Sequence, residues 1–198
     1  MSKKKRAAKP VEPVFEIDKK VRKALLPYRE TKPVEAIGRL SQIGDQAQLR
    51  VLAGGTVVFG LVRRDPRMIG AGVRMLIAHE VATLMKDFVK RRVIRARPRS
   101  AAGKEHKPRK GRDTRKEASS FPSGHSAGAV AVARAAAAVH PQHAAAANAA
   151  AAGVSLARIP GCAHYPTDVA AGAAIGAVAA GLVNAAWRQA ARLVARRA

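Results

Sequence analysis

The sequence is poor in cysteine, aromatic residues and acidic residues, and each shortage excludes a class of protein. Its single cysteine, Cys162, excludes an intrachain disulfide framework and a cysteine-rich zinc site. Aromatic residues make up only 4% of the 198 residues, so side chains that could stack on nucleic-acid bases are few. Because 13 Asp and Glu stand against 37 Lys and Arg, the formal charge is +24 at pH 7. This charge indicates an anionic partner or surface.

Alanine is abundant and supplies nearly half of the hydrophobic residues, which make up 48% of the chain. Alanine favours helices, whereas the β-branched residues typical of sheets are few. The length suits one domain. We therefore predict an all-α fold in which residues 34–198 form one helical domain. Residues 1–33 are rich in Lys and Pro and lack an apolar core, so we expect a basic, disordered arm.

Five apolar segments are expected to form the helices of a bundle, preceded by an interfacial helix over the amphipathic residues 34–48. Only the segments Met68–Val89 and Thr167–Trp187 comfortably reach the ~20 apolar residues that a membrane span needs. Arg134 falls near the middle of the segment Gly124–Val139. Gly172 and Gly176 have a spacing typical of closely packed helices in lipid. Hydropathy alone leaves a membrane bundle and a soluble bundle both open. The segments are Leu49–Val62, Met68–Val89, Gly124–Val139, Gln142–Ile159 and Thr167–Trp187.

The positive charge is concentrated in the first part of the chain. Residues 1–117 hold 31 Lys and Arg against 12 acidic residues, a net charge of +19. By contrast, the only charged residues between Ala135 and Trp187 are Arg158 and Asp168. This asymmetry indicates two surroundings, water or headgroups for the first part and hydrocarbon for the second.

The first candidate functional segment is residues 90–98. Lys90 and Arg97 are two helical turns apart, so we expect both to project from one face at the end of a helix that Pro98 then terminates. Taken alone, the segment fits a basic patch at a membrane edge or on nucleic acid better than a catalytic site.

The second segment is residues 121–126, directly before an alanine-rich helix. Ser123 is a candidate N-cap, and the small residues Ser123 and Gly124 leave backbone N–H groups uncovered at the start of the helix. This arrangement binds phosphate oxygens with help from the helix dipole. His125 would stand beside the bound anion in the first turn. An ordinary cap with an incidental histidine is an equally good interpretation of this segment alone.

The third segment is residues 158–168, which contains Arg158, His164 and Asp168. Asp168 is the only acidic residue after Glu117, and it lies four residues after the histidine. A hydrogen bond from the imidazole to this carboxylate would orient the ring and leave its other nitrogen free to attack. The alternative is that Asp168 only stabilises the start of a helix.

Together the three segments contain the groups needed for phosphoryl transfer without a metal. Three cations (Lys90, Arg97 and Arg158) can neutralise phosphate oxygens that backbone amides hold in place. His164 can serve as the nucleophile and His125 as the acid. No His, Cys, Asp or Glu cluster has the spacing of a zinc or magnesium site, so we expect no metal and no cofactor.

At this point the sequence resembles the PAP2 (type 2 phosphatidic acid phosphatase) superfamily, which also includes vanadium haloperoxidases and bacterial acid phosphatases. The first segment matches the family motif K-x6-R-P, and the second contains P-S-G-H in full. The third matches S-R-x5-H-x3-D except that Ala157 stands where the family has Ser. The resemblance covers residues 49–187.

The resemblance implies a helical bundle whose motifs converge at one end, and catalysis through a phosphohistidine. By this resemblance His164 attacks phosphorus with the aid of Asp168, His125 protonates the leaving group, and water then releases phosphate. The phosphate oxygens would be held by Lys90, Arg97, Ser123, Gly124 and Arg158. The histidines that match no motif position, and are expected to be non-catalytic, are His79, His106, His140 and His143.

The resemblance also implies a small multi-pass membrane enzyme with about five transmembrane helices, which acts on polyprenyl, glycerolipid or lipid-sugar phosphates. With five spans, the N-terminal arm and all three motifs lie on one side of the membrane. Because that side carries more Lys and Arg, the positive-inside rule places the site on the cytoplasmic side of the cell's inner membrane.

Two alternatives remain open at the level of sequence. A vanadate-dependent haloperoxidase would use the same site residues on the same fold. A basic nucleic-acid-binding protein would explain the net charge, but the charge avoids the alanine-rich half of the chain. We expect a lipid phosphate and the membrane as partners and no nucleic acid.

Overall fold

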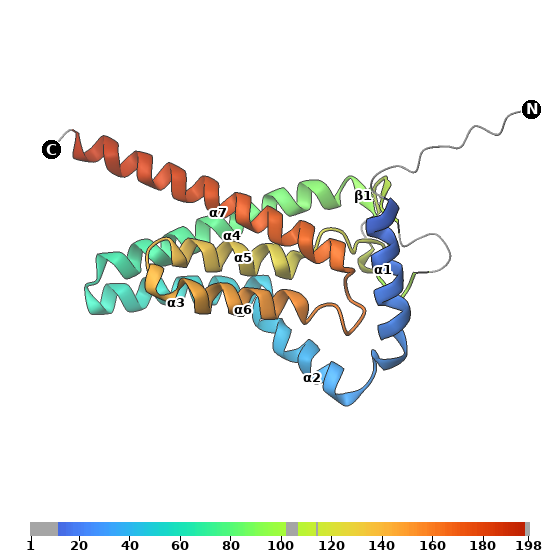
Figure 1. Ribbon diagram of the computed structural model, residues 1–198. Coiled ribbons are helices and arrows are strands. Elements are labelled where there is room, and N and C mark those ends of the chain that lie inside the picture. Colours follow the sequence, from blue (N-terminus) through green and yellow to red (C-terminus); the bar gives the residue numbers. More distant parts are fainter. Residues whose placement is uncertain (1–11, 102–106, 114, 197–198) are drawn as a thin grey trace, which may run out of the picture.

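Five helices form an up-and-down bundle, and the predicted all-α fold is confirmed (Figure 1). The computed structural model describes residues 12–101, 107–113 and 115–196. Helix α5 lies at the centre of the bundle and packs against α4, α6 and α7, while α3 packs mainly against α4. The five helices agree with the five apolar segments predicted from the sequence; they are α3 (Gln46–Arg63), α4 (Pro66–Lys90), α5 (Gly124–Ala137), α6 (Ala144–Leu156) and α7 (Pro166–Ala195).

Side-chain caps and prolines define where these helices begin. The Asp45 carboxylate accepts a hydrogen bond from the backbone N–H of Gln46, and Asp65 caps α4 in the same way. Pro66 and Pro166 occupy the first positions of α4 and α7, where the missing N–H costs no hydrogen bond. Because α5 ends at Ala137, Arg134 lies exposed in its last turn, and the predicted position near mid-helix was wrong.

Small residues allow α5 and α7 to pack at backbone distance. A Cβ atom added at Gly172 would lie 2.3 Å from the Ser123 carbonyl oxygen, and one at Gly176 would lie 2.3 Å from that of Ala127. No side chain larger than hydrogen fits at either position. The close packing predicted from the Gly172–Gly176 spacing is therefore confirmed, and it continues into an alanine-rich core between α4, α5 and α7.

The outer surface of the bundle is apolar, as expected for a membrane protein. Large apolar side chains on α3 and α4, among them Phe59, Leu84 and Phe88, are more than half exposed. By length and composition, two helices of the described chain, α4 and α7, qualify as membrane spans, the same two that the sequence indicated. Helices α5 and α6, with 14 and 13 residues, are only about 20 Å long, shorter than a hydrocarbon core of about 30 Å.

The N-terminal region is folded over most of its length, and the prediction of a disordered arm was wrong for residues 12–33. Helix α1 (Glu12–Leu25) is followed by a 3₁₀ turn, η1 (Leu26–Tyr28), and by α2 (Lys32–Leu40). Sequence reasoning missed α1 because the amphipathic stripe of this helix lies among lysines and prolines. Residues 1–11 lie outside the described residues.

The predicted amphipathic helix over residues 34–48 is divided in two. Helix α2 ends at Leu40, a 3₁₀ turn η2 (Ser41–Gly44) follows, and α3 begins at Gln46. The division has a local cause, because Asp45 is extended and acts as the N-cap of α3. The η2 turn packs against α5 and α6.

The long connection between α4 and α5 contains the only described strands. Strands β1 (Val93–Ile94) and β2 (Arg109–Lys110) form an antiparallel pair in which Val93 lies opposite Lys110, and a 3₁₀ turn, η3 (Lys116–Ala118), follows. A further 3₁₀ turn, η4 (Pro141–His143), joins α5 to α6.

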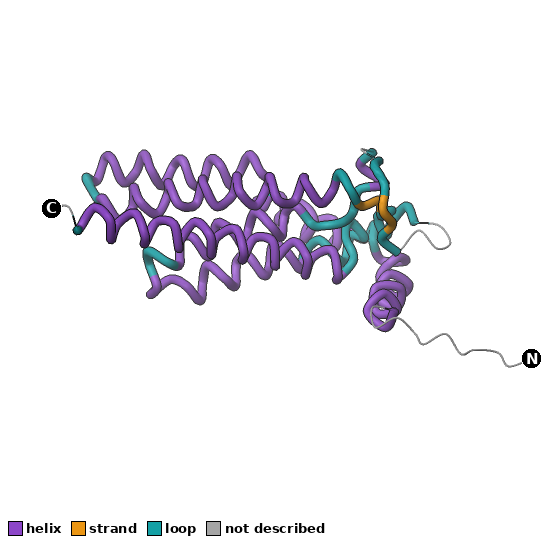
Figure 2. The backbone as a smooth tube through the Cα atoms, turned by 90° about the horizontal axis from the view of Figure 1, so that it is seen from above, coloured by secondary structure: helices purple, strands orange, loops and turns teal. Residues whose placement is uncertain are grey.

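All three motif segments lie at the end of the bundle beside α1 and the strand pair, which we call the motif end (residues 90–98, 122–125 and 158–168). Viewed from above, loops and strands gather at this end (Figure 2). The α3–α4 turn, the α5–α6 turn and the C-terminus lie at the other end (Figure 1). The predicted convergence of the motifs at one end is therefore correct.

Candidate active site

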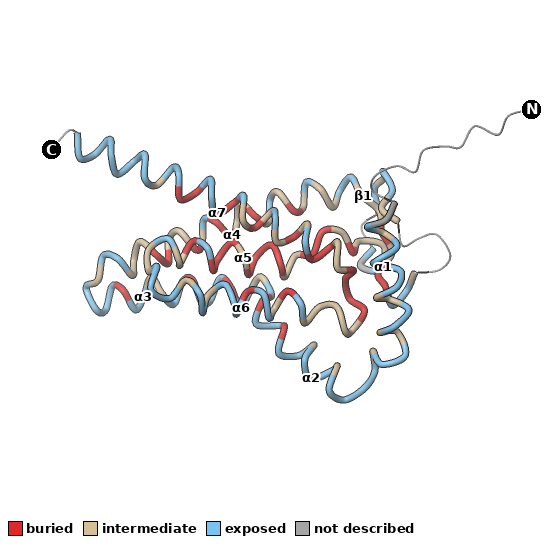
Figure 3. The backbone as a smooth tube through the Cα atoms, viewed as in Figure 1, coloured by how far each residue is buried: buried red, intermediate tan, exposed pale blue. Residues whose placement is uncertain are grey.

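Buried residues continue from the bundle interior into the motif end, so the functional side chains are held in a packed environment (Figure 3). His164 and Asp168 are 3% and 0% exposed, and Ser123 is fully buried. The backbone N–H of Ser123 donates to the Asp168 carbonyl at 2.9 Å, which ties the second motif to the third.

The imidazole of His164 is oriented by a backbone carbonyl. Its Nδ1 lies 2.7 Å from the carbonyl oxygen of Ser120, and because a carbonyl only accepts, Nδ1 carries the proton. In the neutral ring Nε2 then holds a lone pair. Burial lowers the pKa of His164 below 6.5, although the Asp168 carboxylate opposes this shift, so the ring is neutral near pH 7. The arrangement provides a neutral, oriented nitrogen nucleophile.

Asp168 does not make the hydrogen bond to His164 that the sequence suggested. Its Oδ2 lies 3.7 Å from the imidazole Nδ1, beyond hydrogen-bonding distance, and accepts instead from the backbone N–H of Tyr165 at 2.8 Å. Its Oδ1 accepts from the Arg95 guanidinium. The carboxylate therefore caps the start of α7, as the alternative interpretation held, and also acts on the ring through its charge at close range.

The three cations predicted from the sequence converge at the motif end. Lys90 Nζ donates to the Ser119 carbonyl at 3.3 Å, one residue from the carbonyl that holds His164. Burial, together with the charges of Arg99 and Arg158, lowers the pKa of Arg97 to about 10, and burial also lowers the pKa of Arg158. Concentrated positive charge of this kind, partly withdrawn from water, favours binding of an anion.

Lys90 and Arg97 do not share a helix face, and this prediction was wrong. Helix α4 ends at Lys90, and the chain continues in an extended form through β1. Arg97 is positioned by its backbone N–H, which donates to the Glu117 carbonyl at 2.8 Å. The pairing of β1 with β2 holds residues 93–94 in an extended form, and this pairing cannot be predicted from the local sequence. The seven-residue spacing of Lys90 and Arg97 therefore wrongly indicated a helix.

The P-S-G-H segment forms the start of α5 as predicted. The Ser123 Oγ accepts from the backbone N–H of Ser126 at 3.4 Å and from its hydroxyl at 2.9 Å. At Gly124 an added Cβ would lie 3.2 Å from Cδ of Lys86, so a side chain would crowd Lys86 at the start of α5. The expectation that both amides are uncovered was wrong for Ser123, whose N–H donates to the Asp168 carbonyl. His125 stands in the first turn, and its Nε2 is buried without a hydrogen-bond partner in the described chain.

Four residues at the motif end were missed by sequence reasoning. Asp18, Arg95 and Thr167 form a buried polar network with Asp168, and the Ser41 hydroxyl accepts from Arg158 Nη1 at 2.8 Å. Arg95 offered a weak signal, since it alternates with Arg97 in an extended stretch. Asp18 and Ser41 offered none, because they are 77 and 117 residues distant from their arginine partners along the chain.

The remaining histidines lie apart from this cluster or outside the described residues. His79 is fully buried on α4 with Nδ1 3.0 Å from a Glu80 carboxylate oxygen. At the other end of the bundle, His140 directly precedes η4 and His143 is its last residue. His106 falls outside the described residues. In the part of the chain that the structure describes, no group of three or more His, Cys, Asp or Glu could hold a metal ion.

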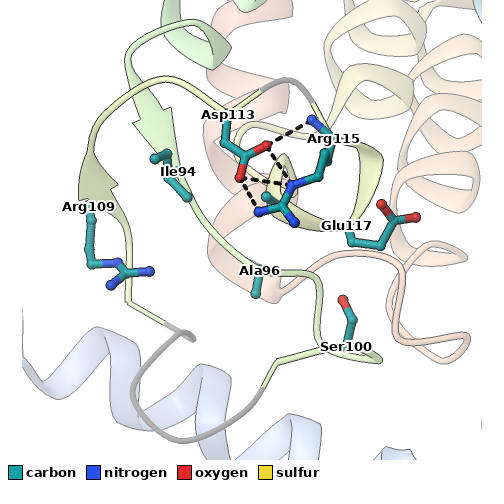
Figure 4. A pocket seen from close by; sticks show the side chains of 8 residues that line it. Ile94, Ala96, Ser100, Arg109, Asp113, Arg115 and Glu117 are labelled. Carbon is teal, nitrogen blue, oxygen red and sulfur yellow. Dashed lines mark hydrogen bonds and ion pairs between the residues drawn. The ribbon is translucent and has the colours of Figure 1, made fainter.

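A separate polar pocket of about 210 Å³ lies within the α4–α5 connection (Figure 4). An Asp113–Arg115 ion pair borders it on one side, with Arg109 and Glu117 nearby. Ala96 lines the pocket, and because side chains alternate along an extended chain, Arg95 and Arg97 point away from it. This pocket is therefore distinct from the cation cluster.

Comparison with known proteins supports one family. A family model described as the PAP2 superfamily matches residues 69–192, a range that contains all three motif segments. No curated protein matches the chain.

Two solved structures share the fold of this chain. One is the first transmembrane PAP2 type phosphatidylglycerolphosphate phosphatase from Bacillus subtilis, with a TM-score of 0.62 and 22% identity over 89% of this chain and 87% of that one. The other is LpxE from Aquifex aeolicus, with a TM-score of 0.58 and 19% identity over 83% of this chain and 92% of that one. At such identities the likeness shows the fold.

Proposed function

Because this chain belongs to the PAP2 superfamily and is a phosphatase of that type, we propose that it hydrolyses phosphate or diphosphate monoesters of membrane lipids at its motif end. The chain is a membrane protein with a PAP2-type helical bundle. A substrate with a membrane-embedded chain and a phosphate at the interface would meet both the apolar outer surface and the cation cluster. The solved structures of similar fold include a phosphatidylglycerolphosphate phosphatase, which supports a lipid substrate.

The observation that carries this proposal is the orientation of His164. With Nδ1 held by the Ser120 carbonyl, the Nε2 lone pair is free to attack phosphorus, and the ester P–O bond breaks as the N–P bond forms. Charge that develops on the phosphoryl oxygens is stabilised by Lys90, Arg97 and Arg158. The amide of Gly124 contributes at the start of α5, whereas that of Ser123 already donates to the Asp168 carbonyl.

His125 completes the reaction as acid and base. To act as the acid, His125 must carry a proton on Nε2, which lacks a partner in the described chain and can therefore donate to the leaving oxygen. Because burial lowers the pKa of this ring to about 4, we propose that the negative charge of the bound phosphate favours the protonated form. In the second step the same nitrogen accepts a proton from water as that water attacks the phosphohistidine. The N–P bond breaks, phosphate is released and both histidines return to their starting state. No step uses a metal or a cofactor.

A phosphate-release assay tests this proposal. Purified protein in detergent or vesicles is offered polyprenyl, glycerolipid and lipid-sugar phosphates in the presence of EDTA, with His164→Ala as the blank. We expect wild-type protein to release phosphate from at least one lipid, and vanadate to inhibit the release. Equal release by wild type and His164→Ala would contradict the mechanism. Bromide oxidation by the vanadate-loaded protein would instead favour a haloperoxidase.

For the membrane orientation, we propose that the motif end faces the cytoplasm from the inner membrane. The five-span arrangement expected from the sequence assigns to the side of the motif end the 12 Lys and Arg of residues 1–39 and the 8 of residues 99–116. It assigns to the opposite side the 3 of residues 63–67 and the 4 of residues 188–197. Reporter fusions at residue 10 and at the C-terminus test this assignment. An external N-terminus would contradict it.

A further inference from the structure

Helix α1 inserts one carboxylate into the interior of the motif end. Asp18 is 0% exposed, although its neighbours Ile17 and Lys19 are exposed on the same helix. Its Oδ1 accepts from the backbone N–H of Thr167 at 3.1 Å, and its Oδ2 accepts from the Thr167 hydroxyl. An ionised side chain is rarely buried so completely unless it is paired.

The partner of Asp18 is Arg95, which connects it to Asp168. Arg95 Nη2 donates to Asp18 Oδ2 at 2.5 Å, while Nη1 donates to the Thr167 hydroxyl at 2.7 Å and to Asp168 Oδ1. The guanidinium carbon lies 4.0 Å from the centre of the Tyr165 ring, which restricts its plane. Arg95 is therefore fixed between two buried carboxylates, one from α1 and one from α7.

The charges of this network explain the need for a second carboxylate. An arginine paired with Asp168 alone would neutralise the carboxylate beside His164. With Asp18 present, Arg95 is shared and the three groups together carry one net negative charge. Because the imidazole of His164 gains positive charge when Nε2 attacks phosphorus, a net negative charge 3.7 Å from Nδ1 stabilises that change.

Helix α1 is also anchored to the first motif. Arg22, one turn after Asp18, donates from Nε to the Pro98 carbonyl and from Nη2 to that of Ala101, both at 2.7 Å. The helix therefore spans the segments that carry Arg97 and Asp168. It lies outside the matched family range of residues 69–192.

We propose that Asp18 is a positioning residue of the phosphatase site, which acts through Arg95 to hold a charged Asp168 beside His164. The inference rests on the proposed function. Under this proposal α1 contributes a positioning residue to the catalytic site, although its sequence predicted a basic, disordered arm.

The test compares Asp18→Asn with Glu16→Gln in steady-state lipid phosphate hydrolysis. Asp18→Asn keeps the shape of the side chain and removes its charge. Glu16→Gln removes the same charge from an exposed position of the same helix. We expect Asp18→Asn to lower kcat about 10- to 100-fold with KM within threefold of wild type, because the phosphate-binding cations are untouched. Glu16→Gln should leave both constants unchanged.

A purely structural role of Asp18 predicts a different result. If α1 only stabilised the fold, folded Asp18→Asn protein would keep a kcat within twofold of wild type, and that result would overturn the inference. A rise in KM that accounts for the whole loss of kcat/KM would also overturn it.

Should Asp18→Asn fail to fold, Thr167→Val decides the question. It removes the hydroxyl that bridges Asp18 and Arg95 in addition to their direct ion pair, and it removes no charge. We expect a fall in kcat of about 3- to 10-fold at unchanged KM, and an unchanged kcat would overturn the inference. Wild-type protein that releases no phosphate would contradict the proposed function, and this inference with it. Active wild-type and equally active Asp18→Asn protein would contradict this inference alone.

Discussion

Helices α5 and α7 contact each other in two buried regions, one along their length and one at the motif end, and different interactions hold each region together. Along their length the helices meet through glycine and alanine, and a Cβ at Gly172 or Gly176 would collide with backbone carbonyls. At the motif end the same helices meet through charges and hydrogen bonds, with Asp168 fully buried. The first region allows the second: because Gly172 lets α7 approach Ser123, the backbone of Ser123 reaches that of Asp168.

The comparison implies a division of roles. Substitutions in the small-residue contact should change the free energy of unfolding, whereas substitutions among the buried charges should change catalysis. The following predictions are ordered by the size of the expected effect in free energy.

The largest effect is expected from Arg97→Gln. Loss of one buried cation that we propose to stabilise the transition state should lower kcat/KM about 100- to 1000-fold. The change is measured by phosphate release from the best lipid phosphate. Arg63→Gln, which removes the same charge from the exposed end of α3, is the control and should retain full activity. A fall in kcat/KM of less than threefold for Arg97→Gln would show that this residue does not belong to the active site.

Gly176→Ala should disrupt the close contact that small residues form between α5 and α7. The added methyl group would lie 2.3 Å from the Ala127 carbonyl oxygen and 2.9 Å from the Ala131 nitrogen, and helix backbone cannot move aside cheaply. We expect the free energy of unfolding to fall by about 1–3 kcal/mol, measured by thermal or denaturant unfolding in detergent.

Gly181→Ala is the matched control on the same helix. No atom lies within 4 Å of a Cβ added there, so the variant should be as stable as wild type or up to about 1 kcal/mol more stable. Equal destabilisation by the two variants would show that helix contact is not the cause.

Ser41→Ala should have a moderate effect on catalysis. The Ser41 hydroxyl accepts from the Arg158 guanidinium at 2.8 Å, and it donates to the Gly38 carbonyl at 2.6 Å. Without it, Arg158 loses one of the contacts that orient it, and kcat/KM should fall about 3- to 10-fold. Thr56→Ala, on the exposed face of α3, removes a comparable hydroxyl and should leave kcat/KM unchanged. Equal kinetics for Ser41→Ala and wild type would show that η2 does not position Arg158.

The smallest effect is expected in the pH dependence. The nucleophile must be neutral, and burial lowers the pKa of His164 below 6.5, so kcat/KM should begin to fall only at a pH below 6.5. The Asp168 charge raises this pKa against the effect of burial. Asp168→Asn should therefore shift the acid limb to still lower pH while it lowers the maximum. A shift of the limb to higher pH would contradict the assigned interaction.

Much of the fold could be predicted because its signals are local. Apolar segments bounded by Asp65–Pro66 and by Pro166 give the helices, and the spacing of Gly172 and Gly176 gives their contact. The candidate site residues could be proposed from the sequence because each motif is contiguous. The paired strands were missed because they depend on partners that no local pattern shows. The division at Asp45 was missed although its cause is local, because the amphipathic pattern of residues 34–48 runs through the N-cap.

What the sequence by itself determined is the helical bundle and the set of groups proposed to bind and attack phosphate. Their types and spacings are covalent properties of the chain. Only the tertiary structure decided how they are held: His164 by a carbonyl of Ser120, Arg158 by Ser41, and Asp168 by Arg95 shared with Asp18. These contacts join residues 44 to 117 positions apart in the chain. Hydrogen bonds and ion pairs at such separations exist only after the helices have packed.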